Sequence, residues 1–519
     1  MIEENDDPDG HGVGPEFPGP AWSVRNEALR DAYSRIRERE DIRFLFGAKL
    51  TGCQGSIGSF RLCLETRDEV IEETVGAVVL ATETEAVPLF ESYGLSEAGN
   101  AETLSRLENM LDPKTGDKEA ALSLTRGDQI ALLSGFAREG DPLSQRRILN
   151  CLHDLDEMGY RTYVYTRNLK VADDGLEELA KEDRQLGTVF FKLEEWPKIS
   201  ADGRQISHLD PVLECEVQLE PKLIVLEEEL LPATANQRLA RTLNIASGED
   251  GFLQEENIHR LPVHTNRRGI FAVGSARDIM TPEQIRNDAA HAAIALKDDF
   301  QALQNSLFGS RTFIDEDKCC ACLTCYRLCP HGAITVEDKP VISMLDCQAC
   351  GLCASQCPQG AISIPDIPWQ ETKQSVAESL REGKETARSP RIIAYCCRNS
   401  AYDAGMAAQA FNRDLPSGLE IVEIPCAGSI NHDLILSSLN EGADGLLILG
   451  CHFGACKSSQ GNTYAQHASS RLGSILEEVG LSQERVRFRT LADNMDLEFA
   501  RYTREMEENL HRLGRNPLA

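Results

Sequence analysis

The chain has 519 residues, 41% of them hydrophobic and 26% charged, a length and balance typical of about three globular domains. Its formal net charge of −30, from 53 basic and 83 acidic residues, argues against nucleic acid as a partner, because phosphate binding needs a basic surface. No apolar run reaches the roughly 18 residues that span a bilayer, and the acidic first residues differ from a secretory signal. We therefore expect a cytoplasmic protein with no direct membrane span, which could join a membrane complex only through partners.

Cysteine is the most informative residue type. There are 18 cysteines, and most lie between Cys319 and Cys456. A secreted disulfide scaffold is usually short and spreads its cysteines through the fold. Bunched cysteines in a long chain without a signal peptide indicate reduced thiolates that bind metal.

The N-terminal 310 residues divide into a lead-in and a long α/β region. Residues 1–40 are an acidic segment that we expect to be disordered up to about residue 25 and then helical. Residues 41–310 alternate strands and helices, which predicts a degenerate, doubly wound, parallel dinucleotide-binding-like domain. The predicted strands are 76–81, 130–133, 162–165, 223–226 and 269–273, and the predicted helices are 144–157 and a long one from Pro282.

Residues 311–366 contain two copies of one cysteine motif. Cys-x2-Cys-x2-Cys-x3-Cys-Pro begins at Cys319 and again at Cys347, the run typical of bacterial two-cluster ferredoxins, in which the fourth cysteine binds the other cluster. The sequence therefore predicts an α+β ferredoxin domain with two 4Fe–4S clusters. Structural zinc also uses Cys-x2-Cys pairs, but it needs neither the third cysteine nor the Cys-Pro closure. The predicted ligands are Cys319, Cys322, Cys325 and Cys357 for cluster 1, and Cys347, Cys350, Cys353 and Cys329 for cluster 2.

After a linker over 367–389, residues 390–519 form a predicted parallel α/β domain. Three of its strands run into cysteines, at Cys396-Cys397, Cys426 and Cys451, and Cys456 follows. Functional groups gather outside the carboxyl ends of parallel strands, so these thiols can converge on one point. Thiolates in that number favour an iron–sulfur centre or zinc, although buried inert cysteines are the simpler alternative.

The C-terminal segment resembles the delta subunit of methyl-viologen-reducing hydrogenase. The resemblance is carried by Cys426-Ala427-Gly428, by 442–445, by Gly450 through Cys456 and by Gly461-Asn462. It implies a 2Fe–2S cluster bound by Cys397, Cys426, Cys451 and Cys456, with Cys396 as a substitute for Cys397. Many relatives have a further cysteine where this chain has Ser400.

Residues 40–310 resemble the A-type subunit of heterodisulfide reductase, a family that binds FAD. The segments that carry this resemblance are 46–48, 55–60, 77–82, 163–167, 269–276 and 282–296. By resemblance, Ala81, Thr82, Gly274 and Asp278 would contact FAD. However, 1–50 holds no G-x-G-x-x-G after a strand, and Leu226 is followed by three glutamates that would repel a phosphate. The sequence leaves open whether FAD binds or the domain is only a scaffold.

The order of these modules is similar to that in the B-type subunit of the quinone-interacting membrane-bound oxidoreductase complex. It implies an electron-transfer subunit that relays single electrons between iron–sulfur or flavin partner subunits, of the hydrogenase, formate dehydrogenase or heterodisulfide reductase type. No catalytic triad or acid–base pair emerges from the sequence, so an electron relay is favoured over a substrate-converting subunit. One alternative is an FAD-dependent, bifurcating enzyme. Another is an assembly scaffold with ferredoxin clusters only.

Overall fold

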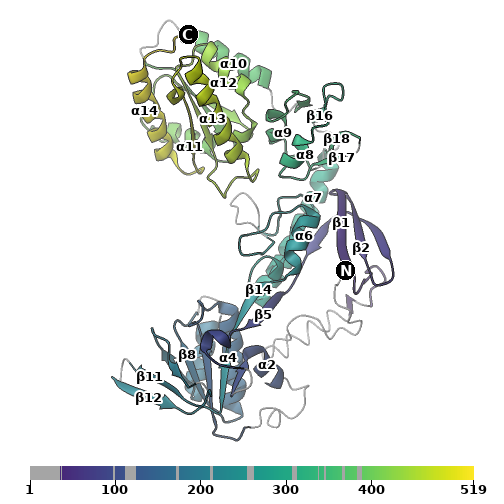
Figure 1. Cartoon of the computed structure of the whole chain (residues 1–519), viewed down its shortest axis with the longest axis vertical. Helices are drawn as coiled ribbons and strands as arrows, with labels where there is room; N and C mark the ends of the chain where they lie inside the picture. Colours follow the sequence, from purple (N-terminus) through teal and green to yellow (C-terminus); the bar gives the residue numbers. More distant parts are fainter. Residues whose placement is uncertain are drawn as a thin grey trace.

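The computed structural model describes residues 35–36, 38–96, 100–111, 124–170, 175–200, 202–210, 214–253, 262–306, 312–336, 338–343, 346–364, 369–382 and 389–518. The predicted lead-in and helix over 1–40 lie almost wholly outside these residues. The described parts follow one another along the long axis of the molecule (Figure 1), with the cysteine-rich segment between a two-part N-terminal region and a C-terminal α/β domain.

The part of the N-terminal region nearest the cysteine-rich segment combines an antiparallel sheet with a short parallel pair. The sheet consists of β1 (Lys49–Ser56), β2 (Ser59–Glu65) and β3 (Val70–Val75). Ile57 and Gly58 make its first turn, and Gly58 has a φ of 88°, a conformation that glycine adopts without strain. The parallel pair and its helices are β4 (Val78–Leu80), β15 (Ile270–Ala272), η2 (Gly274–Ala276), α6 (Ala235–Leu243) and α7 (Pro282–Ser306).

The second part, here called the inserted unit, is a parallel sheet of order β6-β13-β7-β8-β9. Its strands are β6 (Ala101–Thr103), β7 (Gln129–Ser134), β8 (Arg161–Thr166), β9 (Val189–Lys192) and β13 (Leu223–Leu226). Its helices are η1 (Glu91–Tyr93), α2 (Leu104–Leu111), α4 (Pro142–Glu157) and α5 (Leu176–Leu186). A small antiparallel sheet adds β10 (Lys198–Ile199), β11 (Ile206–Asp210) and β12 (Cys215–Leu219).

An antiparallel ribbon of β5 (Thr84–Pro88) and β14 (Glu228–Pro232) links the two parts. The single doubly wound sheet expected over 41–310 is therefore wrong in its extent. Strands 130–133, 162–165 and 223–226 do share one parallel sheet, whereas 76–81 and 269–273 pair separately. Apolar strand patterns predict burial on both faces but not which strands are neighbours.

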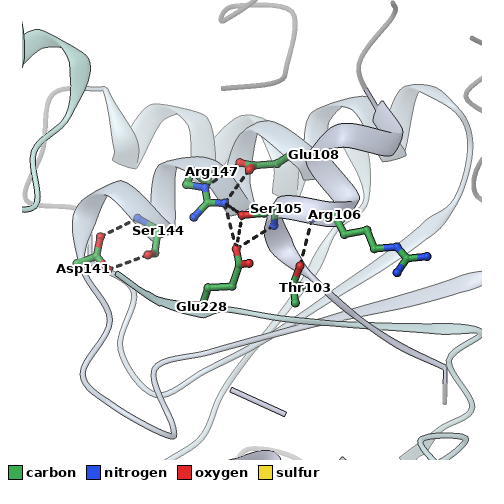
Figure 2. A network of polar contacts seen from close by, with 8 residues as sticks. All are labelled: Thr103, Ser105, Arg106, Glu108, Asp141, Ser144, Arg147 and Glu228. Atoms are coloured by element: carbon green, nitrogen blue, oxygen red, sulfur yellow. Dashed lines mark hydrogen bonds and ion pairs between the residues drawn. The ribbon is translucent and has the colours of Figure 1, made fainter. Parts of the chain in front are cut away.

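A buried polar network fixes the start of the ribbon to the inserted unit (Figure 2). The Arg147 guanidinium on α4 donates to Glu108 on α2 at 2.9 and 2.7 Å and contacts Glu228 at 3.2 Å. Ser105 donates its backbone N–H to Glu228 at 2.9 Å. Burial raises the pKa of Glu108, an effect that Arg147 opposes. One cation thus holds two buried carboxylates from different elements.

Replacing Arg147 with methionine is expected to destabilise the inserted unit by about 3–5 kcal/mol, because two buried carboxylates lose their cation. Amide hydrogen exchange of β7 measures the change as a lower opening free energy. Arg106→Met is the matched control on α2, because Arg106 is exposed and pairs with Glu102 at 3.2 Å. That variant should change the opening free energy by less than about 1 kcal/mol; equal losses in both variants would contradict the assignment.

The cysteine-rich segment forms two short antiparallel strand pairs and two short helices. Its elements are β16 (Phe313–Ile314), α8 (Thr324–Leu328), β17 (Ile334–Val336), β18 (Pro340–Ile342), α9 (Leu352–Ser355) and β19 (Ile362–Ser363). β16 pairs with β19 and β17 with β18, both antiparallel. α10 (Trp369–Glu382) leads on to the last domain.

The C-terminal domain is a parallel sheet of order β21-β20-β22-β23 between helices. Its strands are β20 (Ile392–Cys397), β21 (Leu419–Ile424), β22 (Gly445–Gly450) and β23 (Val486–Thr490). Its helices are α11 (Ala401–Ala410), η4 (Ala427–Ser429), α12 (His432–Asn440), α13 (Gly461–Glu478), η5 (Gln483–Arg485) and α14 (Asp496–Leu513). All six residues of β20 and of β22 are buried, as expected for central strands covered on both faces. Among the described residues, no helix has the length and apolarity to cross a bilayer.

Candidate metal centres

The structure brings the eight ferredoxin-type cysteines together in two groups of four. Each group lines a small cavity. In both groups, three cysteines come from one repeat and the fourth from the other, the exchange that the spacing predicts. The first cavity is lined by Cys319, Cys322, Cys325 and Cys357, and the second by Cys329, Cys347, Cys350 and Cys353.

The two loops share a backbone conformation that turns the chain around each cavity. Ala321 and Ala349, which are equivalent positions of the repeat, have φ values of 52° and 49°. Left-handed backbone is costly for residues other than glycine, so its recurrence indicates a constraint common to both loops. Backbone N–H groups also donate to the fourth sulfurs, from Ala333 to Cys329 at 3.4 Å and from Ala361 to Cys357 at 3.3 Å. Such donors stabilise thiolate charge.

The second group is more enclosed than the first. Cys322 is exposed, and its pKa is lowered by the Thr324 hydroxyl. Burial raises the pKa of Cys350 to about 11 and also raises that of Cys353. Buried thiols with raised pKa values become thiolates when a cationic metal centre compensates the charge.

The C-terminal domain gathers a third group of four cysteines. Cys397, Cys426 and Cys451 stand at the carboxyl ends of β20, β21 and β22, and Cys456 lies in the loop before α13. All four are at most 3% exposed and form one cluster. The sulfurs of Cys397 and Cys451 are 3.9 Å apart. Convergence at this edge follows from the parallel order of the strands.

Close packing of these sulfurs shifts their protonation. The pKa of Cys426 is raised by its contacts with the sulfurs of Cys397 and Cys456 and by burial. The pKa of Cys456 is lowered, because Cys426 and Cys451 donate their S–H groups to it. Four thiols in one dry site form a chemical environment suited to a cationic iron centre.

The structure separates the two adjacent cysteines of β20. Cys397 belongs to the four-cysteine group. Cys396 points to the other face of the sheet, where it is 0% exposed and packs in the core with Leu447 and Phe499. Successive side chains of a strand face opposite ways, so Cys396 cannot replace Cys397 in this geometry. Ser400 is buried beside Cys451 and lowers the pKa of that thiol.

Two glycines let the chain approach the third group. A Cβ on Gly461 would lie 2.4 Å from the Cys426 sulfur and 3.4 Å from that of Cys456. A Cβ on Gly428 would lie 2.6 Å from the Gly461 carbonyl oxygen. Neither position was predicted as part of the site, although Gly428 and Gly461 stand within the motifs that carry the family resemblance.

The second and third groups adjoin each other. Cys350 packs against the four C-terminal cysteines and forms a hydrogen bond with Ser458. Nearby, Ser355 donates to the Gly428 carbonyl at 2.7 Å, which ties α9 to η4. Sequence reasoning missed this contact, because Ser355 and Gly428 are 73 positions apart.

Two histidines lie close to these groups. Both ring nitrogens of His452 are engaged within the C-terminal domain, Nδ1 with Thr490 at 2.9 Å and Nε2 with Met495 Sδ at 3.2 Å. His331 lies against the second cavity.

The residues expected to contact FAD lie at one edge. Ala81 and Thr82 follow β4, and Gly274 follows the adjacent β15. Asp278 donates its backbone N–H to the Gly274 carbonyl at 3.4 Å, and its carboxylate accepts from Ile279 N–H at 2.7 Å. The polar groups at this edge are already engaged. Thr82 donates to Asn236 at 2.7 Å, and Gly274 N–H donates to the buried Asp288 at 3.0 Å.

In the inserted unit, too, protein carboxylates already accept from the backbone amides that could bind a phosphate. Gly135 N–H, directly after β7, donates to Glu227 at 2.8 Å, and Ser134 and Tyr93 hydroxyls donate to the same carboxylate at 2.9 and 3.0 Å. Asp141 caps α4 through Ser144 N–H at 2.8 Å. These are the positions at which a pyrophosphate binds in dinucleotide-binding folds. The described residues therefore do not fit a dinucleotide there.

Comparisons with known proteins agree with the paired cysteine motifs. Residues 312–335 and 340–363 each match the family described as 4Fe-4S binding domain, which places the chain among iron–sulfur proteins. Residues 392–514 match the family described as methyl-viologen-reducing hydrogenase, delta subunit. Over this C-terminal region, the chain belongs to that family.

Individual relatives extend the comparison. The D-type iron-sulfur subunit of the F420-non-reducing hydrogenase of Archaeoglobus profundus is 31% identical over 125 residues, which are 24% of this chain and 91% of the relative. The A-type subunit of the ferredoxin/F(420)H(2)-dependent CoB-CoM heterodisulfide reductase of Methanosarcina acetivorans is 26% identical over 489 residues, 89% of this chain. The chain spans 60% of that relative's length. Most of the chain is thus homologous to the A-type subunit of heterodisulfide reductase.

A solved thioredoxin reductase of Lactococcus lactis covers 55% of this chain and 87% of its own length, with 17% identity and a TM-score of 0.37. That likeness is too low to support an argument.

Proposed function

We propose that the chain is an electron-transfer subunit of a heterodisulfide reductase- or hydrogenase-like complex. Cys319, Cys322, Cys325 and Cys357 would hold cluster 1, and Cys329, Cys347, Cys350 and Cys353 would hold cluster 2, both of the 4Fe–4S type. Cys397, Cys426, Cys451 and Cys456 would hold a 2Fe–2S cluster. Each such centre, when bound, takes up and releases single electrons.

The contact of Cys350 with the four C-terminal cysteines carries this proposal. A ligand of cluster 2 that packs on the third group makes the two sites neighbours in a water-poor region. The chain itself would hold the three groups of thiols in a row. The row begins at cluster 1, where Cys322 is exposed, passes through cluster 2 and ends in the buried group of the C-terminal domain. This arrangement favours conduction through the protein over substrate chemistry within it.

We further propose that this chain holds no FAD, so that the flavin of a complete complex sits in a partner subunit. Support comes from Glu227, Asp141 and Asp288, whose carboxylates accept from the amides that would face a pyrophosphate. The partners would be other iron–sulfur or flavin subunits of hydrogenase, formate dehydrogenase or heterodisulfide reductase type. The similarity to hydrogenase and heterodisulfide reductase subunits motivates this choice.

Iron and zinc quantification of anaerobically purified protein tests the proposal. Two four-iron centres and one two-iron centre give about ten iron atoms per chain. About eight would support the scaffold alternative, in which the C-terminal cysteines hold no iron. Zinc in place of iron, with no EPR signal after dithionite reduction, would refute the relay. Tightly bound FAD in the purified chain would favour the flavoenzyme alternative.

A further inference from the structure

The two ferredoxin repeats are alike in sequence but differ in what surrounds them. Gly332 and Gly360 are equivalent positions, three residues after Cys329 and Cys357. A Cβ on Gly360 would meet nothing within 4 Å, whereas one on Gly332 would lie 3.2 Å from both Cδ and Nε of Arg267. The N-terminal region therefore places a side chain against the loop after Cys329, which is the cluster 2 ligand from the first repeat. Among the described residues, it places none at the matching point after Cys357.

Arg267 is held firmly at this junction. It is 5% exposed, and its guanidinium donates to the carbonyl oxygens of Leu243 at 2.8 Å and Gly55 at 2.6 Å. It also lies over the Phe60 ring, 5.2 Å from the ring centroid. The preceding residue, Asn266, donates to the Pro330 carbonyl at 2.8 Å. The charge is thus fixed to the loop that follows Cys329.

The positive charge has no directly bonded counter-charge. Among the described residues, Arg267 forms no ion pair, and its buried Nε has no hydrogen-bond partner. Two titratable groups face it. The pKa of the Cys53 thiol is raised by burial and lowered by Arg267. Asp346, next to Cys347, accepts from Ile57 N–H at 3.4 Å and offsets part of the field of Arg267.

Reduction adds one negative charge to an iron–sulfur centre, so a nearby cation in a low-dielectric region stabilises the reduced form. The cluster 1 loop has two cations among the described residues, and neither is buried. Lys318 has a 62% exposed side chain and pairs with Asp315 at 3.0 Å. Arg327 donates to the Cys322 carbonyl at 2.8 Å but is exposed. Solvent screens these charges far more effectively. The two cluster sites therefore lie in different electrostatic surroundings.

We propose that Arg267 raises the reduction potential of cluster 2 above that of cluster 1, so that an electron settles beside the C-terminal cysteines. This inference rests on the proposed function, because it requires both clusters to be present. Arg267 acts as a positioning residue of the relay: it touches the loop of cluster 2, and its charge biases the direction of transfer. The proposal also gives a role to the dinucleotide-like region, in which the amides that could bind phosphate already donate to Glu227 and Asp288.

An EPR-monitored redox titration of the full chain tests the inference. Arg267→Gln removes the charge and should lower the ratio of reduced to oxidised cluster 2 about tenfold at a fixed potential, equivalent to about 59 mV for one electron. Cluster 1 should keep its midpoint. The cluster 2 signal is identified as the one that a Cys353→Ser variant loses. Arg267→Lys, which keeps the charge, should restore most of the shift.

Arg268→Gln is the matched control, because Arg268 is paired with Asp299 at 2.9 Å and should shift the cluster 2 midpoint far less than Arg267→Gln does. If the Arg267→Gln variant loses iron, Arg267→Met can be titrated in its place, because it removes the charge but keeps apolar packing against Phe60. Unchanged midpoints in an iron-replete Arg267 variant, or equal shifts of both clusters, would overturn the inference. Absence of cluster signals in the unaltered chain would instead refute the proposed function.

Discussion

Substitution of Cys353 by serine is expected to reduce the iron content from about ten to about six atoms per chain. Cys353 lines the second cavity with Cys329, Cys347 and Cys350, and its loss leaves a cubane with three thiolates in a buried site. Turnover with native partner subunits should fall more than about 100-fold, since in the proposed relay cluster 2 would join cluster 1 to the C-terminal group. Iron analysis and steady-state electron transfer measure the two effects.

Cys320→Ser is the control for this substitution. Cys320 lies in the equivalent loop of the first repeat but is exposed and falls outside the ligand spacing, so its loss should leave both iron content and turnover unchanged. The assignment of ligands fails if Cys353→Ser keeps all ten iron atoms. It also fails if Cys320→Ser loses four.

The sequence predicts best those parts of the site whose residues are close together along the chain. The ferredoxin-type cysteines are grouped by short loops and an internal repeat of 28 residues, so spacing alone assigned them to two sets. The C-terminal cysteines were predicted to converge because each follows an apolar strand, and parallel strands end at one edge of a sheet.

The choice between Cys396 and Cys397 could not be made from the pattern. An alternating strand reveals its two faces, but every residue of β20 is buried, so polarity does not distinguish the site face from the core face. Knowledge of the helices that cover each face was needed. The pairing of strands in 41–310 was mispredicted for a related reason, because β4 and β15 are far apart in the chain and look like the strands of the inserted unit.

Contacts between domains left no mark in the sequence. Arg267 and Ser355 lie in ordinary surroundings, and only their partners, Gly332 and Gly428, make them notable. From the sequence, the glutamates after Leu226 were expected to repel a phosphate, and FAD binding was left open. In the structure, Glu227 accepts from the Gly135 amide.

Replacing Gly461 with alanine is expected to abolish the third centre while sparing the other two. The added methyl group would lie 2.4 Å from the Cys426 sulfur, closer than any van der Waals contact, and backbone on the other side limits its retreat, because Gly428 packs on Gly461. Cys426 must then move away from Cys397 and Cys456. We expect iron to fall from about ten to about eight atoms, with both four-iron EPR signals retained.

Gly480→Ala is the control for Gly461→Ala, because an added methyl group at this position contacts no neighbouring atom. Gly480 also lies in the C-terminal domain, at a φ of 82°, and a Cβ there would meet nothing within 4 Å. This variant should cost about 1 kcal/mol of stability through backbone strain and lose no iron. If Gly461→Ala retains ten iron atoms, Gly461 is not the close support of the Cys426 thiolate. If it loses all of them, the three centres assemble together, and the neighbouring Cys350 is the contact to test next.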